Sequence, residues 1–186
     1  MKISFDLDNV IFNMEPIYQK AFDGTGLTYY KPKLWNVRDC YPEQVANNLI
    51  KLFGDDMLYQ MKVIDDELPY IINTVLSMKG FDTSFVTERL KKQPLKTHNQ
   101  LLRNGIICSR DQVYDEYPPK IEVLKKIKSE LHFDDSPNVV EDCLRNGVDV
   151  IMISNDDTLY NHHLRSKVEH YSSLKTALMK TRIYTK

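Results

Sequence analysis

Two aspartates near the start of the chain, Asp6 and Asp8, have the type and spacing needed to hold a cation or attack a phosphate. They follow Ile3 and Phe5 in an apolar run too short for a helix, which predicts a buried strand that ends in Asp6. Ligands bind at the carboxyl ends of strands in open α/β sheets, where such a pair can offer a carboxylate and a backbone carbonyl to one hard cation. Asn9 tolerates the left-handed backbone that a tight exit from the strand needs.

The pair is not specific by itself, because carboxylates at strand ends are commonly solvated turn residues or helix caps. Other polar residues follow later strands or open a helix: Thr87, Lys120, Asp134 and Asp135. A carboxylate that attacks a phosphate dianion meets charge repulsion, which Mg²⁺ held by the acids and the ammonium of a lysine can offset. Thr87 can donate a hydrogen bond to a phosphoryl oxygen, and Asp8 can protonate the leaving alkoxide and later take a proton from water. The set therefore predicts phosphoryl transfer through an aspartyl-phosphate.

Strands alternate with helices along the chain, which predicts an α/β fold with a doubly wound, mostly parallel, Rossmann-like sheet. After the first strand, we expect strands at 81–86, 106–108 with 113–114, 131–133 and 148–153. Helices are expected at 68–79, 94–104, from Lys120 after Pro118 and Pro119, at 139–146 and at 161–180. Parallel strands end at one edge of the sheet, so this order brings the acids, the threonine and the lysine together.

Residues 14–66 have a different character, with aromatic side chains scattered among glycines and prolines. Apolar residues between positions 45 and 53 have helical spacing, and Pro42 stands near the start of that segment. We interpret residues 14–66 as a small helical cap, inserted into a core domain of residues 1–13 and 67–186.

The composition limits the classes of protein that the chain can belong to. At 186 residues, it is long enough for one domain and a small insert, but not for two full domains. Hydrophobic residues at 42%, charged residues at 27% and a net charge of -1 disfavour duplex nucleic acid as a partner. No apolar run is long enough to span a bilayer and no signal peptide is evident, so we expect a cytoplasmic protein without a membrane partner. The three cysteines fit neither a disulfide framework nor a zinc site.

Taken in order, four segments resemble the four motifs of the haloacid dehalogenase superfamily of phosphatases. These segments are residues 6–10, residues 85–87, Lys120, and residues 133–137. Within that superfamily the chain looks most like the 5'(3')-deoxyribonucleotidase-like branch, which carries a small helical cap after the first motif. The closer resemblance rests on Thr87-x-Arg89, on the Asp-Asp-Ser-Pro form of the last motif, and on Leu159-Tyr160-Asn161 after the last strand.

The resemblance implies a Mg²⁺-dependent phosphomonoester hydrolase that acts on a small phosphorylated metabolite, in particular a (deoxy)nucleoside monophosphate. It makes Asp6 the nucleophile, Asp8 the general acid and base, and Thr87 with Lys120 the clamp on the phosphate. The presence of Asp8 argues against a dehalogenase, which would not need the second acid.

The same resemblance implies a ligand set for Mg²⁺. The cation would bind the Asp6 carboxylate, the backbone carbonyl of Asp8 and an aspartate of the last motif. We favour Asp135 as the direct ligand and Asp134 as its support.

Some residues depart from the pattern of the superfamily. Glu88 follows Thr87 where related sequences usually carry a small residue, and a carboxylate beside a phosphate site is unfavourable unless it turns away or pairs with Arg89. Residues 154–157 add more acid near the same edge. Three alternatives therefore stay open: a phosphatase of another metabolite or of a nucleic-acid 3' end, a degenerate phosphate- or nucleotide-binding module, and a receiver-like signalling domain. The insert and Asp8 disfavour the last of these.

Three further residues are candidate contacts to the substrate: Arg89, Trp35 and Tyr41. Aromatic rings offer stacking surfaces for a nucleobase. Aromatic residues in a small helical insert more commonly serve its packing, so both roles are open for the tryptophan and the tyrosine.

Overall fold

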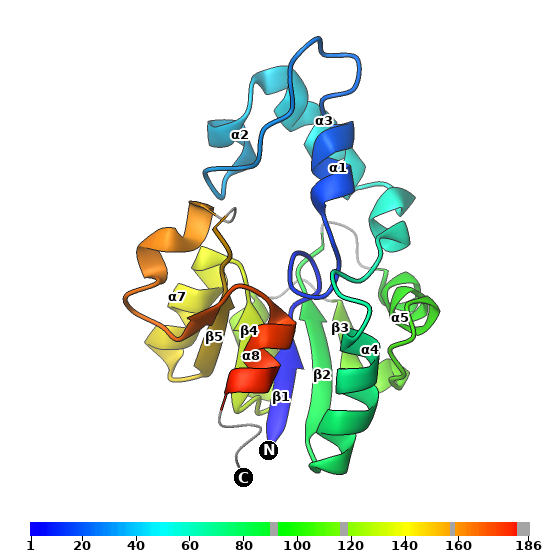
Figure 1. Ribbon diagram of the computed structural model, residues 1–186, viewed down its shortest axis with the longest axis vertical. Coiled ribbons are helices and arrows are strands. Elements are labelled where there is room, and N and C mark those ends of the chain that lie inside the picture. Colours follow the sequence, from blue (N-terminus) through cyan, green and yellow to red (C-terminus); the bar gives the residue numbers. More distant parts are fainter. Residues whose placement is uncertain (90–92, 116–118, 157–158, 182–186) are drawn as a thin grey trace.

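The sheet forms the centre of the molecule. The computed structural model describes residues 1–89, 93–115, 119–156 and 159–181. Within these ranges, six parallel strands form one sheet in the order β3-β2-β1-β4-β5-β6 (Figure 1). The strands are β1 (Lys2–Phe5), β2 (Asp82–Thr87), β3 (Val113–Asp115), β4 (Leu131–Asp134), β5 (Asp149–Ile153) and β6 (His170–Tyr171). The prediction of an α/β fold with a parallel sheet is confirmed.

Side chains of the central strands alternate between two faces of the sheet, and each face has its own apolar core. On one face, Phe5 stacks on Phe133 with ring centroids 5.2 Å apart and lies 6.0 Å from Phe85. This face is covered by α4 (Leu68–Tyr70), which continues as the π-helix η2 (Ile71–Leu76), and by α8 (Leu174–Lys180). The other face is covered by α6 (Lys120–Lys126) and α7 (Pro137–Asn146), while α5 (Pro94–Arg103) packs near β3.

The insert, residues 14–66, rises from the edge where the strands end (Figure 1). Its helices are α1 (Glu15–Lys20), α2 (Val37–Cys40), α3 (Glu43–Phe53) and the 3-10 helix η1 (Asp56–Gln60). The chain leaves and returns at one place, since Asn13 N donates to Lys62 O at 2.9 Å and Ile64 N donates to Ile11 O at 2.8 Å. The division of the chain into core and cap stays a prediction.

Two of the predicted elements are wrong. Residues 106–108 are not a strand, since the chain runs through them irregularly to the 3-10 helix η3 (Arg110–Gln112) before β3 begins. The predicted helix at 161–180 is instead the 3-10 helix η4 (Leu159–Leu164), then β6, then α8.

Residues 161–180 do not form a single helix because some of them pair with β5 at the edge of the sheet. The unpaired backbone groups of β5 bind the chain that follows η4: Met152 N donates to Glu169 O at 2.9 Å and Ser154 N donates to Tyr171 O at 2.8 Å. Helix α8 then begins afresh, because the side chain of Ser173 accepts a hydrogen bond from Thr176 N. In the described ranges, none of the helices combines the length and the apolarity needed to cross a membrane.

The stacked phenylalanines should carry a large share of the stability. We expect Phe5→Ala to lower the free energy of unfolding by about 3–5 kcal/mol, because it leaves a cavity between two fully buried rings. Denaturant unfolding would measure the loss. The matched control is Leu102→Ala at a side chain that is 43% exposed, where we expect a change within about 0.5 kcal/mol. Similar losses in both variants would contradict this account of the core.

Candidate active site

Asp6 and Asp8 lie where β1 passes into a tight loop of residues 7–12. Leu7 O accepts hydrogen bonds from Ile11 N at 2.9 Å and from Phe12 N at 2.8 Å, so the loop folds back on its own start. Asn9 has a φ of 62°, the left-handed conformation that its residue type predicts. Because Leu7 is fully buried between them, the two aspartates share one side of the chain and point toward the same cavity.

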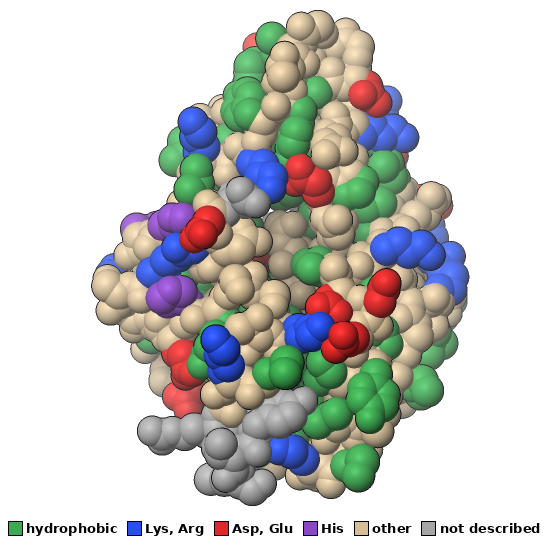
Figure 2. Space-filling model, in the orientation of Figure 1, with side chains coloured by type: hydrophobic (Ala, Val, Ile, Leu, Met, Phe, Trp, Pro, Cys, Tyr) green, Lys and Arg blue, Asp and Glu red, His purple; other side chains and the backbone are tan. Residues whose placement is uncertain are grey.

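One cavity of about 440 Å³ collects the predicted residues from four different elements. It is lined by Asp6, Asp8, Thr87, Lys120 and Asp135, among others. In the space-filling view, the surface is hollowed between the insert and the core (Figure 2). The structure thus brings together side chains from the ends of β1, β2 and β4 and from the start of α6.

Lys120 forms the ionic centre beneath this cavity. Its ammonium donates to Asp6 Oδ1 at 2.7 Å and to Asp134 Oδ2 at 2.6 Å, and all three side chains are buried. Burial alone would lower the pKa of Lys120, but Asp134 and Asp6 raise it, so the side chain stays an ammonium. Burial raises the pKa of Asp6 well above its usual value, and Lys120 offsets this only in part.

Both carboxylate oxygens of Asp134 accept hydrogen bonds. Besides Lys120, its Oδ2 accepts from His132 Nε2 at 2.8 Å, while its Oδ1 accepts from Ser136 N at 2.8 Å. His132 is itself bound through Nδ1 to Ser4 Oγ at 2.8 Å. Burial opposes the charge of Asp134, but Lys120 and His132 outweigh it and lower the pKa to about 2. Asp134 therefore lies below the cavity as a fixed negative charge.

Asp135 has a different environment from its neighbour. Its Oδ2 accepts from Asn9 Nδ2 at 3.2 Å and, in a short hydrogen bond, from the hydroxyl of Tyr160. Asn161 Nδ2 donates to the Asp135 carbonyl at 2.8 Å and so fixes the backbone. Burial and the charge of Asp134 raise the pKa of Asp135 to about 7.

Apart from Lys120, the side chains that bind Asp134 and Asp135 were not among the predicted site residues. His132 stands in β4 like any buried strand residue, and nothing in its sequence surroundings marks it as a ligand of Asp134. Tyr160 and Asn161 do stand out in the sequence after the last strand, but their role depends on η4, which turns them back toward β4.

Three carboxylates are close enough to hold one metal ion. Ligand oxygens of Asp6, Asp134 and Asp135 lie within 4.8 Å of one another. All three side chains are buried, and Lys120 is the cation bound between two of them, so a divalent cation would offset the remaining repulsion. An all-oxygen set of this kind suits Mg²⁺. Since Asp134 already accepts on both oxygens, Asp6 and Asp135 are the better placed to contact the ion.

The carboxylate of Asp8 is bound by Arg89, whereas those of Asp6 and Asp134 are bound by Lys120. Arg89 Nη2 donates to Asp8 Oδ1 at 2.6 Å and Arg89 Nε donates to Asp8 Oδ2 at 3.1 Å. Burial alone would lower the pKa of Arg89, but Asp8 more than offsets this and raises it. The guanidinium is therefore charged and engaged with Asp8 rather than free in the cavity.

Glu88 has a structural partner that the sequence did not predict. Its carboxylate accepts a short hydrogen bond from Lys120 N, the first backbone N–H of α6. Pro119, which precedes this helix, supplies no side-chain cap, so Glu88 takes that part. The residue lines the cavity but does not pair with Arg89 in the described contacts. Pro118 and Asp157, two residues that the sequence analysis named near this edge, lie outside the described ranges.

The two aromatic candidates of the insert lie in different places. Trp35 lines the cavity, is 41% exposed, and packs against Tyr160 with ring centroids 5.3 Å apart. Tyr41 is buried among Phe22 and Tyr30 and is not part of the cavity wall. Packing is thus the role that its surroundings indicate.

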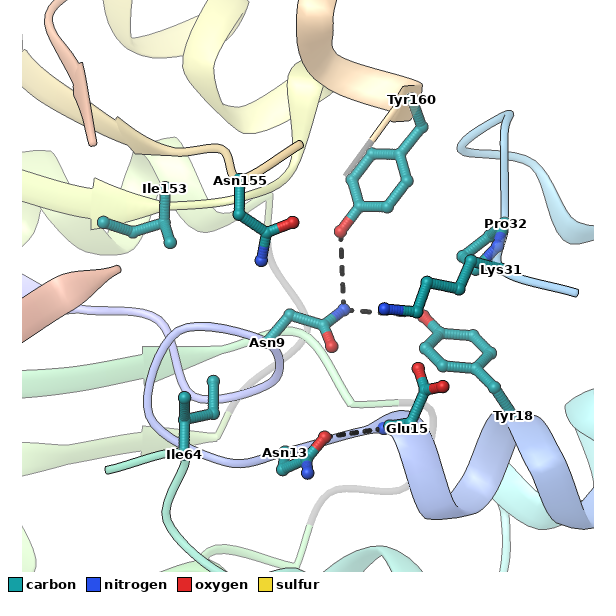
Figure 3. A pocket seen from close by; sticks show the side chains of 10 residues that line it. All are labelled: Asn9, Asn13, Glu15, Tyr18, Lys31, Pro32, Ile64, Ile153, Asn155 and Tyr160. Atoms are coloured by element: carbon teal, nitrogen blue, oxygen red, sulfur yellow. Dashed lines mark hydrogen bonds between the residues drawn. The ribbon is translucent and has the colours of Figure 1, made fainter. Parts of the chain in front are cut away.

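A second cavity of about 310 Å³ shares Asn9 and Tyr18 with the first (Figure 3). Asn9 reaches between the hydroxyls of Tyr18 and Tyr160, with a long contact of 3.5 Å to each (Figure 3). Because Asn9 also donates to Asp135, it links Tyr18 of the insert to the last-motif aspartate of the core.

Comparison with solved structures identifies the fold. A haloacid dehalogenase-like protein of unknown function from Agrobacterium tumefaciens superposes with a TM-score of 0.61 at 12% identity, covering 96% of this chain and 95% of that one. CbbY from Rhodobacter sphaeroides, solved in complex with phosphate, gives a TM-score of 0.56 at 14% identity, covering 95% of each chain. The protein therefore has the fold of haloacid dehalogenase-like hydrolases.

One curated relative is also similar in sequence. It is a Bacillus cereus protein named "Putative nucleotidase", 24% identical over 178 residues, which cover 88% of this chain and 90% of that protein. No family model matches the chain.

The repulsion among the buried carboxylates predicts that Mg²⁺ stabilises the fold. At a concentration 100 times its dissociation constant, the ion should add about 2.7 kcal/mol and raise the unfolding midpoint by roughly 5–10 °C. Thermal melts with Mg²⁺ and with a chelator would measure this shift. Asp135→Asn should lose most of it, whereas Asp142→Asn, at an exposed pair with Arg145, should keep it. A shift that survives in Asp135→Asn would place the ion elsewhere.

Proposed function

We propose that this protein is a Mg²⁺-dependent phosphomonoester hydrolase that works through a phospho-Asp6 intermediate. The observation that carries the proposal is the ion-paired Asp6 at the floor of a cavity that Asp8, Thr87, Lys120 and Asp135 also line. The fold supports it, since the solved structures with this fold include hydrolases and a protein bound to phosphate. We place the protein in the cytoplasm.

In the first half of the proposed reaction, Asp6 attacks phosphorus while the ester P–O bond breaks. The leaving oxygen takes the proton of the Asp8 carboxyl and departs as an alcohol. Lys120 donates a hydrogen bond to Asp6 and so offsets part of the cost of ionising this buried carboxylate, while Thr87 donates a hydrogen bond to the phosphoryl group. Bound Mg²⁺ would supply positive charge against the phosphoryl oxygens.

The second half releases the enzyme. Asp8 takes a proton from water, whose oxygen attacks phosphorus, and the bond from phosphorus to Asp6 breaks. Inorganic phosphate leaves, Asp6 is again a carboxylate, and Asp8 is again protonated. Each half uses Asp8 in the opposite direction, which is why one residue can serve as acid and then as base.

We propose a nucleoside monophosphate as the substrate. Above the polar floor, the cavity wall is apolar, with Met14, Trp35, Val37, Ile50 and Phe53 supplied by the insert. A planar base suits such a wall, and a volume of about 440 Å³ lies in the range of small-molecule sites. The name of the Bacillus cereus relative supports the same substrate class.

The roles of Asp6 and Asp8 can be separated by mutation. Asp6→Asn should abolish phosphate release from nucleoside monophosphates in Mg²⁺, because an amide cannot form the acyl-phosphate. Asp8→Asn should reduce kcat by roughly 10²–10⁴-fold, the usual contribution of a general acid or base. Released phosphate is the measurement, and circular dichroism checks the fold. Undiminished turnover in Asp6→Asn would rule out the mechanism.

Trp35 should contribute to recognition of the leaving group. We expect Trp35→Ala to raise KM for a nucleoside monophosphate by more than it raises KM for a small generic phosphate ester, because only the former reaches the ring. The control is Leu34→Ala, which removes an exposed neighbour outside this cavity. Equal changes for both substrates would show that the tryptophan serves packing alone.

A further inference from the structure

Arg89 is a buried residue of the cavity wall, and its described hydrogen bonds go to Asp8 and Gln100. Two of its nitrogens bind the two oxygens of Asp8, at 2.6 and 3.1 Å. Its Nη1 donates to Gln100 Oε1 at 2.8 Å. The side chain of Arg89 is 1% exposed. A planar guanidinium bound on two edges fixes both the position and the orientation of the carboxylate that it holds.

Aromatic rings close the space around this guanidinium. The ring centroid of Tyr59 lies 5.1 Å from Arg89 Cζ, and that of Phe12 lies 5.9 Å away. These contacts add cation–π attraction and leave the side chain little room to swing toward a ligand. Arg89 is thus placed to act on Asp8 rather than on a substrate.

Gln100 connects the arginine to the insert. It lies on α5 of the core and is fully buried. Its Nε2 donates to Leu58 O at 3.1 Å and to Met61 O at 3.2 Å, in the segment through which the insert returns. The hydrogen bonds therefore run without a break from the backbone of that segment through Gln100 and Arg89 to Asp8.

We propose that Arg89 is a positioning residue, which holds the Asp8 carboxyl in place for proton transfer, and that Gln100 sets this position relative to the insert. The inference rests on the proposed function, since it assigns Asp8 to protonating the leaving oxygen. It places Arg89 outside the set of residues that touch the substrate. Proton donation then depends on the segment at 58–61 as well as on Asp8 itself.

The test compares two esters of similar size that need the proton to different degrees. Phenyl phosphate releases a phenolate that must be protonated, whereas para-nitrophenyl phosphate releases an anion that departs readily without a proton. We expect Arg89→Ala to lower kcat/KM for phenyl phosphate at least about tenfold more than kcat/KM for para-nitrophenyl phosphate, because kcat/KM reports the first half of the reaction, in which Asp8 donates the proton. Asp8→Asn should show the same selective loss, and the double variant should lose no more than Asp8→Asn alone.

A matched control uses another arginine that pairs with an aspartate. Arg145 Nη2 donates to Asp142 Oδ1 at 2.6 Å on α7, and neither residue lines the cavity. Arg145→Met should therefore leave the ratio of the two kcat/KM values unchanged. Guanidinium added to Arg89→Ala should restore the rate with phenyl phosphate, because it can enter the vacated space, while sodium chloride at equal ionic strength should not.

Two outcomes overturn the inference. Equal losses for both esters in a folded Arg89→Ala protein would mean that the arginine only stabilises the structure. If the wild-type protein hydrolyses neither these esters nor nucleoside monophosphates, the proposed function fails and this inference fails with it. Should Arg89→Ala not fold, Arg89→Lys gives the same comparison, since a lysine keeps the charge but cannot bind both oxygens in one plane; an unchanged ratio there would also count against the proposal.

Discussion

The ammonium of Lys120 between Asp6 and Asp134 is the interaction on which the rest of the site depends. Burying carboxylates is costly unless a cation and hydrogen bonds compensate. The lysine can reach both acids because α6 starts at the edge where β1 and β4 end, and Glu88 holds that helix start in place. Without this pairing, the adjacent ends of two parallel strands would bring unbalanced charge together inside the protein.

The insert is connected to two aspartates of the site, Asp135 and Asp8, along two separate routes. On one side, Trp35 packs on Tyr160, whose hydroxyl binds Asp135. On the other side, the return segment binds Gln100, and through it Arg89 and Asp8. Asp135 and Asp8 are thus each linked to the insert, which forms the apolar wall of the cavity.

The sequence predicted the sheet and the convergence of acids well, and their partners poorly. Asp6 and Asp135 could be located because an apolar strand that ends in acids must end near the open edge of a parallel sheet. The pairing of Arg89 with Asp8 could not be predicted, because the direction of this buried guanidinium depends on its packing against Tyr59 and Phe12. The wrong prediction of one helix at residues 161–180 has a similar origin. Their apolar residues have helical spacing, but the open edge of β5 pairs with part of the segment.

The pairing of residues 11–13 with 62–64 has a consequence for how such a protein can change over time. The chain departs from the sheet and returns to it at one point, so the strand order does not depend on the length or the sequence of the segment between. Substitutions and even insertions in that segment can accumulate without altering how β1 pairs with β2 and β4. A lineage can therefore change the side chains that wall the cavity while the aspartates at the strand ends are inherited unchanged.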